Sequence, residues 1–251
     1  MGTLPASVRL ALWATAAWNG QALGASVIER SFPDVDDVSG DLDRLQLWGE
    51  LGERVMLCAL PHPGHAQSVP QGSTSLMAET LDAGECAYVP MIGGALVPLI
   101  EPYGPEQDQG WRAELRAFDC SPTPTHRIEM LTGSSIERRL QSEIASATAE
   151  LVDIDLVPWQ RSSERDEAAG HLSGAFGLPA GMPARLARTI WSAATVSTAA
   201  EAALDHDPIV GASAHSQRHE VLRRLMIECD QVLADATNLA ALTMAGVVPD
   251  R

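Results

Sequence analysis

The fold of this chain is decided by residues 84–104, which read GECAYVPMIGGALVPLIEPYG. Two apolar runs meet at Gly93-Gly94, a dipeptide that takes positive φ at both central positions of a tight turn without steric cost. The stretch therefore predicts a β-hairpin with a two-residue loop. In that register the large side chains would face one another across the hairpin, as Ile92 with Ala95, Val89 with Pro98 and Tyr88 with Leu99.

Proline restricts this hairpin. With a two-residue loop, Pro90 would lie opposite Val97 at a hydrogen-bonded pair, where its missing N–H is needed, whereas Pro98 would lie at a non-bonded pair. Two arrangements relieve the conflict, a β-bulge near Pro90 or a loop wider than two residues. Of the two, we favour the bulge.

Three further segments predict strands beside the hairpin. Residues 54–60 are apolar on both faces, whereas residues 111–118 alternate between apolar and charged side chains. Residues 126–130 repeat that alternation briefly. We predict an α+β protein with a central antiparallel sheet of four or five strands, covered at least partly on both sides. Because strand 111–118 has one charged face, it should lie toward the margin of the sheet.

Helices are predicted before and after this sheet. The N-terminal helices are expected near residues 5–18, 21–30 and 41–52. After Gly133 the apolar spacing is helical, which predicts helices over residues 136–151, from Pro183 onward and over about 213–245. Residues 1–131 would then hold helices plus the antiparallel sheet. Residues 132–251 would be a helical region packed on the sheet, either as a second domain or within one compact domain.

An acidic segment at residues 34–43, DVDDVSGDLD, superficially matches a calcium-binding loop. With Gly40 as the loop glycine, Val35 would occupy the first ligand position, and no Glu occupies the closing position. We therefore interpret the segment as the start of a helix, with Ser39 or Asp41 as the N-cap and the carboxylates near the positive end of the helix dipole.

Composition and charge exclude several classes of partner. The 251 residues carry a formal net charge of −16, and all 17 basic residues are arginines. An acidic surface repels phosphate groups, so binding to nucleic acids or to anionic membranes is disfavoured. No stretch reaches the roughly 18 apolar residues of a membrane helix. The four cysteines are widely spaced in apolar patterns, as expected of reduced thiols in a cytoplasmic protein.

Histidines are the candidates for a metal site. His62 and His65 lie three residues apart in a turn, and His215 and His219 lie at i, i+4 on one face of the last helix. The HEXXH motif is absent, and no third ligand has an identifiable spacing. A divalent metal at one of these pairs is the one cofactor that the sequence suggests. No catalytic residue is predicted, because the chain has neither a G-x-S-x-G nor a Walker-type motif.

The last helix carries the clearest pattern for interaction. Its apolar residues follow alternating spacings of three and four, which is typical of a helix packed on its own domain or of a dimer seam. We predict a non-enzymatic binding or assembly protein that forms a homodimer through Leu222, Leu225 and Val232. One alternative is a metal-dependent or small-molecule enzyme that uses either histidine pair. Another is a binder of an unidentified small ligand at the junction of the sheet and the C-terminal helices.

Four stretches carry a resemblance to other sequences. They are LALWATAAWNG at residues 10–20, ALPHPG at 59–64, LDAGECAYVP at 81–90 and LVPLIEPYG at 96–104. In these stretches the chain resembles a group of actinobacterial hypothetical proteins, and the absence of lysine fits such a source. The group has no assigned activity, so the resemblance implies scaffold residues and no site residue.

Overall fold

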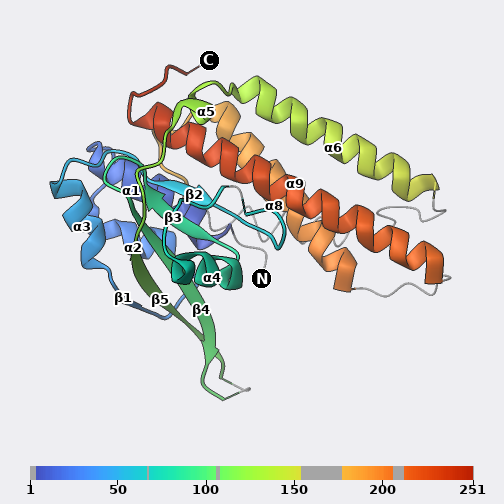
Figure 1. The fold of residues 1–251 in the computed structure, drawn as a ribbon, viewed down its shortest axis with the longest axis horizontal. Helices are drawn as coiled ribbons and strands as arrows, with labels where there is room; N and C mark the ends of the chain where they lie inside the picture. The colour runs from blue at the N-terminus through green and yellow to red at the C-terminus, as the bar shows by residue number, and fades with distance from the viewer. Residues whose placement is uncertain (1–3, 67, 106–107, 154–176, 206–211, 251) are drawn as a thin grey trace. The chain divides into compact units, whose positions relative to one another are not determined.

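The computed structural model describes residues 4–66, 68–105, 108–153, 177–205 and 212–250 (Figure 1). These residues form two compact units. The sheet unit comprises residues 5–131, 177–184 and 237–250, and the helical unit comprises residues 132–153, 185–205 and 212–236. The predicted α+β class is confirmed, with a five-stranded sheet and helices before and after it.

Five strands form one sheet in the order β1-β5-β4-β3-β2. They are β1 (Asp37–Gly40), β2 (Leu57–Ala59), β3 (Cys86–Val89), β4 (Gly94–Tyr103) and β5 (Gly110–Asp119). The strands that the sequence predicted, β2, β3, β4 and β5, pair antiparallel as expected. Strand β1 pairs parallel with β5. The sheet is therefore mixed, because the acidic segment adds a strand that the sequence pattern did not indicate.

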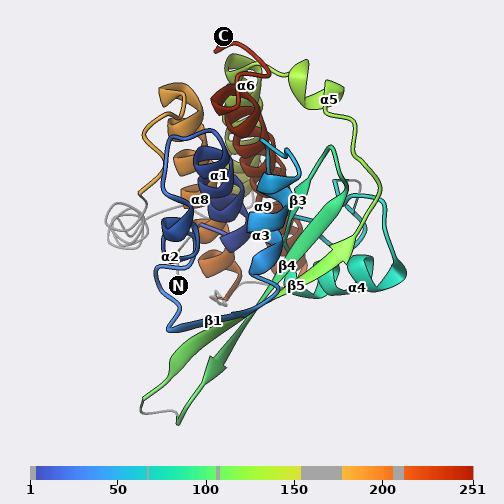
Figure 2. The same cartoon turned by 90° about the vertical axis from the view of Figure 1, so that its left-hand side faces the viewer.

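Helices cover both faces of the sheet within its own unit. They are α1 (Ala6–Trp18), η1 (Gly24–Ser26), α2 (Val27–Ser31), α3 (Asp43–Glu50), α4 (Thr74–Ala83) and α5 (His126–Glu129). One face holds a buried cluster in which Leu76 of α4 packs on Leu57, Tyr88 and Val97. On the opposite face α1 contacts β2, β3 and β4, and Figure 2 shows α1 and α4 on opposite sides of the sheet. The predicted cover on two sides is thus present.

The central hairpin forms, but with a wider loop than predicted. Tyr88 pairs with Ala95 and Val89 pairs with Gly94, so Pro90–Gly93 is a four-residue loop. The two-residue register and the favoured bulge are both wrong, and the wider loop is confirmed. Pro90 lies outside the ladder, so its missing N–H breaks no inter-strand bond.

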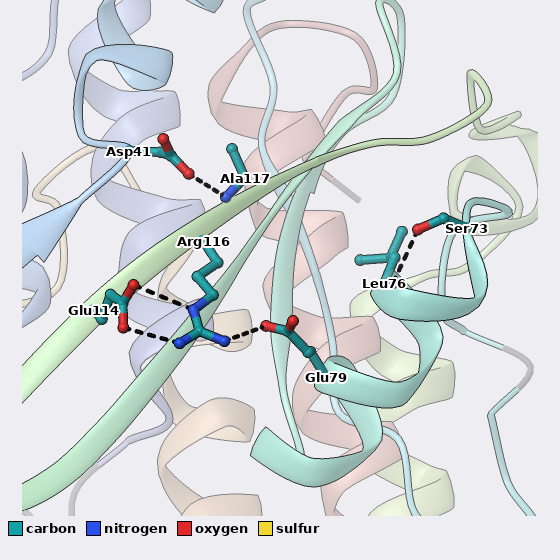
Figure 3. Close-up of polar contacts among 7 residues, drawn as sticks. All are labelled: Asp41, Ser73, Leu76, Glu79, Glu114, Arg116 and Ala117. Carbon is teal, nitrogen blue, oxygen red and sulfur yellow. Dashed lines mark hydrogen bonds and ion pairs between the residues drawn. The ribbon is translucent and has the colours of Figure 1, made fainter.

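Strand β5 shows the predicted alternation, with Ala113 and Leu115 buried and Arg112, Glu114 and Arg116 exposed. The interpretation of the acidic segment as a helix start holds only at its end: residues 37–40 form β1, and α3 begins at Asp43 with neither Ser39 nor Asp41 as its N-cap. Carboxylates explain the difference: Asp36 accepts a hydrogen bond from the N–H of Trp111 and Asp41 accepts one from the N–H of Ala117, each at 2.8 Å. Figure 3 shows the Asp41 contact, beside the exposed ion pairs of Arg116 with Glu114 and Glu79.

Residues 126–130, predicted as a short strand, instead begin with the single-turn helix α5. The N–H of Glu129 bonds to the carbonyl of Thr125, and the Thr125 hydroxyl bonds to the Glu129 carboxylate at 2.5 Å. An i, i+4 side-chain bond of this kind favours a helical turn over an extended chain. The alternation over five residues was too short to exclude it.

The outer edge of β2 is closed by side chains. The Thr15 hydroxyl accepts a bond from the Met56 N–H at 2.9 Å and lies 3.4 Å from the Met56 carbonyl. Asn238 accepts from the Cys58 N–H at 2.7 Å and donates to the Cys58 carbonyl at 2.9 Å. Every one of these residues is 5 % exposed or less, so the side chains take the place of a further strand.

The distal edge of β4 is protected from the addition of a strand in a different way. Successive residues of a strand direct their backbone N–H and C=O groups to alternate edges. Because those of Met56 and Cys58 point away from β3, the pairing register directs those of Gly94 and Leu96 toward β3. In the described residues the pairing of β3 with β4 ends at Leu96, and beyond it Pro98, Ile100 and Pro102 direct their backbone to the same, uncovered edge. Two of these three residues lack an N–H, so this edge is poorly suited to adding a strand.

The helical unit is built from α6 (Gly133–Asp153), α8 (Ala184–Asp205, from Arg185) and α9 (Ala212–Met244, to Ala236). Arg139 of α6 bonds to Asp235 of α9 at 2.9 Å, and Ser197 of α8 bonds to Asp230 of α9 at 2.9 Å. These helices lie where the apolar spacing predicted them. Among the described helices, none is long and apolar enough to cross a lipid bilayer.

The residues proposed as a dimer seam lie inside the chain. Leu222, Leu225 and Val232 are 3 %, 6 % and 0 % exposed. Their three-and-four spacing is therefore that of a helix packed within its own chain, which was the other interpretation of the pattern. A homodimer through these three residues stays a prediction, and it would require the helix to separate from its neighbours.

Candidate functional site

Helix α3 ends in a motif that positions a buried carboxylate. Gly52 has φ of +103°, its N–H bonds to the Gly49 carbonyl, and the N–H of Glu53 bonds to the Trp48 carbonyl at 3.0 Å. These are the two bonds of a Schellman motif, which terminates a helix at a left-handed glycine. The motif turns the chain sharply and fixes the backbone of Glu53 at the start of the segment that leads into β2.

The Glu53 side chain holds the loop of the central hairpin. Its Oε1 atom accepts hydrogen bonds from the N–H groups of Met91 and Ile92 at 2.9 and 2.6 Å. Glu53 is 0 % exposed, and its Oε2 atom has no hydrogen-bond partner among the described residues. One carboxylate oxygen therefore satisfies two donors of the loop, while the other oxygen is buried without compensation.

Both glycines of the hairpin are required for close packing. Gly93 has φ of +85°, and a Cβ atom there would lie 2.2 Å from the carbonyl oxygen of Cys120. At Gly94 a Cβ atom would lie 2.5 Å from the Trp48 indole. Trp48 of α3, whose carbonyl accepts the Glu53 N–H in the Schellman motif, thus packs directly on the first residue of β4.

Four exposed apolar side chains lie on the two segments that Glu53 and Trp48 join, and we name them the hairpin-loop surface: Leu47, Leu51, Met91 and Ile92. Leu47 and Leu51 lie at i, i+4 on α3 and its C-cap, and Leu51 precedes the loop-binding Glu53 by two residues. Leu51 is 61 % exposed and Met91 is 71 % exposed. The sheet unit therefore exposes large apolar side chains on a loop whose backbone is bonded to Glu53.

Neither histidine pair acquires a third ligand in the described residues. His62 and His65 form a tight turn, with the His65 N–H bonded to the His62 carbonyl at 2.8 Å. His215 and His219 lie together as predicted, with ring centroids 4.3 Å apart. No group of three His, Cys, Asp or Glu side chains gathers there or elsewhere in the part of the chain that the structure describes. The metal-dependent enzyme stays a prediction without a complete ligand set.

Burial makes the thiols weak nucleophiles. Desolvation raises the pKa of Cys86 to about 12, of Cys229 to about 12 and of Cys120 to about 11. Since the thiolate is the reactive form, these side chains are overwhelmingly protonated at neutral pH. Cys58 is also fully buried, with both of its backbone polar groups bound by Asn238. The thiols therefore behave as apolar core residues.

A second, partly buried acid serves the start of α1. The helix has Pro5 as N-cap without a side-chain bond, and the Glu85 carboxylate accepts a hydrogen bond from the Ser7 N–H at 2.7 Å instead. Burial raises the pKa of Glu85, although the nearby Arg9 guanidinium opposes that shift. Arg9 is 5 % exposed and its Nη1 atom lies 4.0 Å from the Asp34 carboxylate. This group joins α1 to the entry of β3.

The sequence pattern did not indicate the roles of these two acids. Glu53 and Glu85 each directly precede an apolar strand segment, where a charged residue is most simply taken as an exposed strand end. A signal was nevertheless present at Glu53, because the residue after a left-handed C-terminal glycine is commonly apolar and packs on the helix. A glutamate at that position indicates that its carboxylate has a specific partner.

Two protein-family models match the chain. The N-terminal domain of the Rv1486c-like protein matches residues 7–128, and the C-terminal domain of the same protein matches residues 134–234. The chain belongs to the Rv1486c-like family. The N-terminal domain match contains the whole sheet and the hairpin-loop surface, and the C-terminal domain match contains α6 and α8. No curated protein and no solved structure matches the chain.

Proposed function

We propose that this Rv1486c-like protein is a non-enzymatic binding or assembly protein that self-associates through the hairpin-loop surface. The observation that carries the proposal is the exposure of Met91 and Ile92 on a loop fixed by Glu53. Single exposed apolar residues are ordinary. Four of them around one rigid junction form a contact surface, because a fixed loop loses little conformational freedom on binding.

A second copy is the partner that fits this surface. Residues 86–100 contain no charged side chain, whereas the chain as a whole carries −16. Two copies repel each other wherever their acidic surfaces meet, and they approach at least cost through an uncharged, apolar face. A basic partner, by contrast, would be attracted to the acidic surface elsewhere on the molecule.

The described chemistry favours contact by side chains over strand addition and over catalysis. Asn238 and Thr15 close the β2 edge, and Pro98 and Pro102 remove donors from the distal edge of β4. The raised pKa values of the buried thiols leave little thiolate for covalent chemistry. We further propose a cytoplasmic location, in agreement with buried free cysteines, and an actinobacterial source, in agreement with basic residues that are all arginine.

Sedimentation velocity of the full chain tests the proposal, with a dimer as the expected result. Met91→Asp should weaken self-association by about tenfold or more, since burying one large apolar side chain contributes about 1.5–3 kcal/mol. Met130→Asp is the matched control, because it adds the same charge at a methionine that is 81 % exposed elsewhere in the sheet unit. A monomer at every concentration, or equal effects of the two substitutions, would refute the proposal.

Salt provides a second arm of this experiment. Screening shortens the Debye length from roughly 10 Å at 0.1 M to roughly 3 Å at 1 M salt. Because the copies are strongly acidic and the proposed contact is apolar, self-association should strengthen as salt is added. Dissociation by salt would instead indicate a contact held by ion pairs, such as those of Arg116 and Arg112 on β5.

A further inference from the structure

Glu53 is bonded unequally at its two oxygens. Oε1 accepts from two consecutive backbone N–H groups, while Oε2 is buried and has no partner in the described residues. An ionised carboxylate is stabilised by the two donors and destabilised by its removal from water. A protonated one keeps Oε1 as an acceptor for the loop and removes the buried charge.

Among the described residues, no neighbouring cation offsets the cost of burying this carboxylate. Arg54 follows Glu53, but its guanidinium donates to the backbone carbonyls of Glu53 and Gly49 and not to the carboxylate. Glu50, in the last turn of α3, bonds to Gln46 at the surface. Loop residues 90–93 and Trp48 carry no titratable group. Desolvation therefore outweighs the two hydrogen bonds, and the pKa of Glu53 is raised above its ordinary value.

We propose that Glu53 is a positioning residue that makes the hold on the Met91–Ile92 loop, and with it the hairpin-loop surface, dependent on pH. The effect on self-association rests on the function proposed above, whereas the effect on the loop does not. No other described side chain bonds to the Met91 and Ile92 N–H groups, so the protonation state of this one carboxyl group acts directly on the loop.

The sign follows from linkage. When the loop opens, Glu53 enters water and regains its ordinary pKa near 4.5. The closed loop therefore binds the proton more tightly than the open loop, and protonation favours the closed loop. Below about pH 4.5 this contribution is fully present, and it is lost as the pH rises through the raised pKa of the closed state. Raising the pH over that interval should loosen the loop.

Amide hydrogen exchange of the full chain between pH 5 and pH 8 measures the loop directly. After correction for intrinsic exchange, the opening equilibrium of the Met91 and Ile92 amides should rise with pH, by at most tenfold per pH unit for one proton. Glu53→Gln should remove this dependence. Glu50→Gln is the control, since it deletes an exposed carboxylate three residues earlier, in the last turn of α3, and should keep the wild-type slope. Equal slopes in wild type and Glu53→Gln would overturn the proposal.

Two additional measurements keep the outcome decisive. If Glu53→Gln does not fold, NMR titration of the wild-type Met91 and Ile92 amides should show a midpoint above 4.5, and a midpoint at or below 4.5 overturns the proposal. Sedimentation in parallel separates the two claims. A monomer at every pH refutes self-association while exchange still decides the role of Glu53. A dimer whose pH dependence is the same in Glu53→Gln and Glu50→Gln refutes the pH device alone.

Discussion

The β2 edge and the hairpin loop both bond their backbone to side chains, but with different chemistry. At the β2 edge, Thr15 and Asn238 are neutral groups that donate and accept, and Asn238 matches the N–H and the C=O of Cys58 at once. At the hairpin loop, Glu53 only accepts when ionised, and it binds two N–H groups with one oxygen. The first arrangement leaves little unsatisfied, whereas the second leaves a buried charge.

The difference determines whether the contribution of each region to stability depends on pH. A neutral, reciprocal pair of bonds has no proton to exchange, so its contribution is constant over the physiological pH range. A buried carboxylate contributes according to pH. The β2 edge lies in the core of the sheet unit, while the Glu53 loop carries exposed Met91 and Ile92. Substitutions at each position test this contrast.

Asn238→Leu should have the largest effect. The substitution keeps the branched shape and the number of heavy atoms of the side chain and leaves the Cys58 N–H and C=O buried without partners, at about 1–3 kcal/mol each. We expect a loss of about 3 kcal/mol in the free energy of unfolding of the sheet unit, measured by urea denaturation. Thr243→Val is the control on the same helix, because it removes only a bond to the Leu239 carbonyl one turn earlier. A loss no greater than that of the control would show that the β2 edge needs no side-chain partner.

Thr15→Val should follow, with a loss of about 1–2 kcal/mol. Valine has the same shape as threonine, so the change removes the acceptor for the Met56 N–H and little packing. Thr15→Ser keeps the hydroxyl and should restore most of the loss of hydrogen bonding. If serine were as destabilising as valine, the Thr15 methyl group and not its hydroxyl would be the stabilising part.

The sequence predicted individual helices and strands better than the long-range pairing between them. Helix α1, the alternation of β5 and the three long C-terminal helices follow from periodicity and from stops such as Asn19-Gly20, which are local signals. Strand β1 was missed because it lies in the Asp-rich segment 34–43, which favours a helix start locally. Only the β5 backbone, more than 70 positions later, makes Asp36 and Asp41 strand-end acceptors.

The candidate site was hidden for the same reason. Glu53 acquires its role from a loop 38 and 39 residues away, a distance at which periodicity carries no information. The last helix shows a related ambiguity: the spacing at Leu225 suits a dimer seam and equally suits packing on helices of the same chain, where Leu225 is buried. Pattern identifies an apolar face and does not identify what covers it.

Glu53→Gln should change the pH dependence of stability more than stability itself. Because the folded-state pKa of Glu53 is raised, its contribution is present below about pH 4.5 and declines as the pH rises through the folded-state value. The wild-type free energy of unfolding should therefore decline relative to Glu53→Gln across that interval, with a slope of at most about 1.4 kcal/mol per pH unit. Urea denaturation at several pH values gives the difference, and parallel curves would contradict the prediction.

Asp41→Ala should have the smallest effect. Its carboxylate bonds to the Ala117 N–H as Glu53 bonds to the loop, but Asp41 is exposed, so water can replace the lost acceptor. We expect a loss below about 1 kcal/mol, faster exchange of the Ala117 amide, and near-wild-type behaviour for Asp41→Asn, which retains an acceptor oxygen. A loss as large as that of Asn238→Leu would mean that burial does not set the ranking. The contrast between the two buried regions would then reflect their place in the sheet, and not the access of water to their hydrogen bonds.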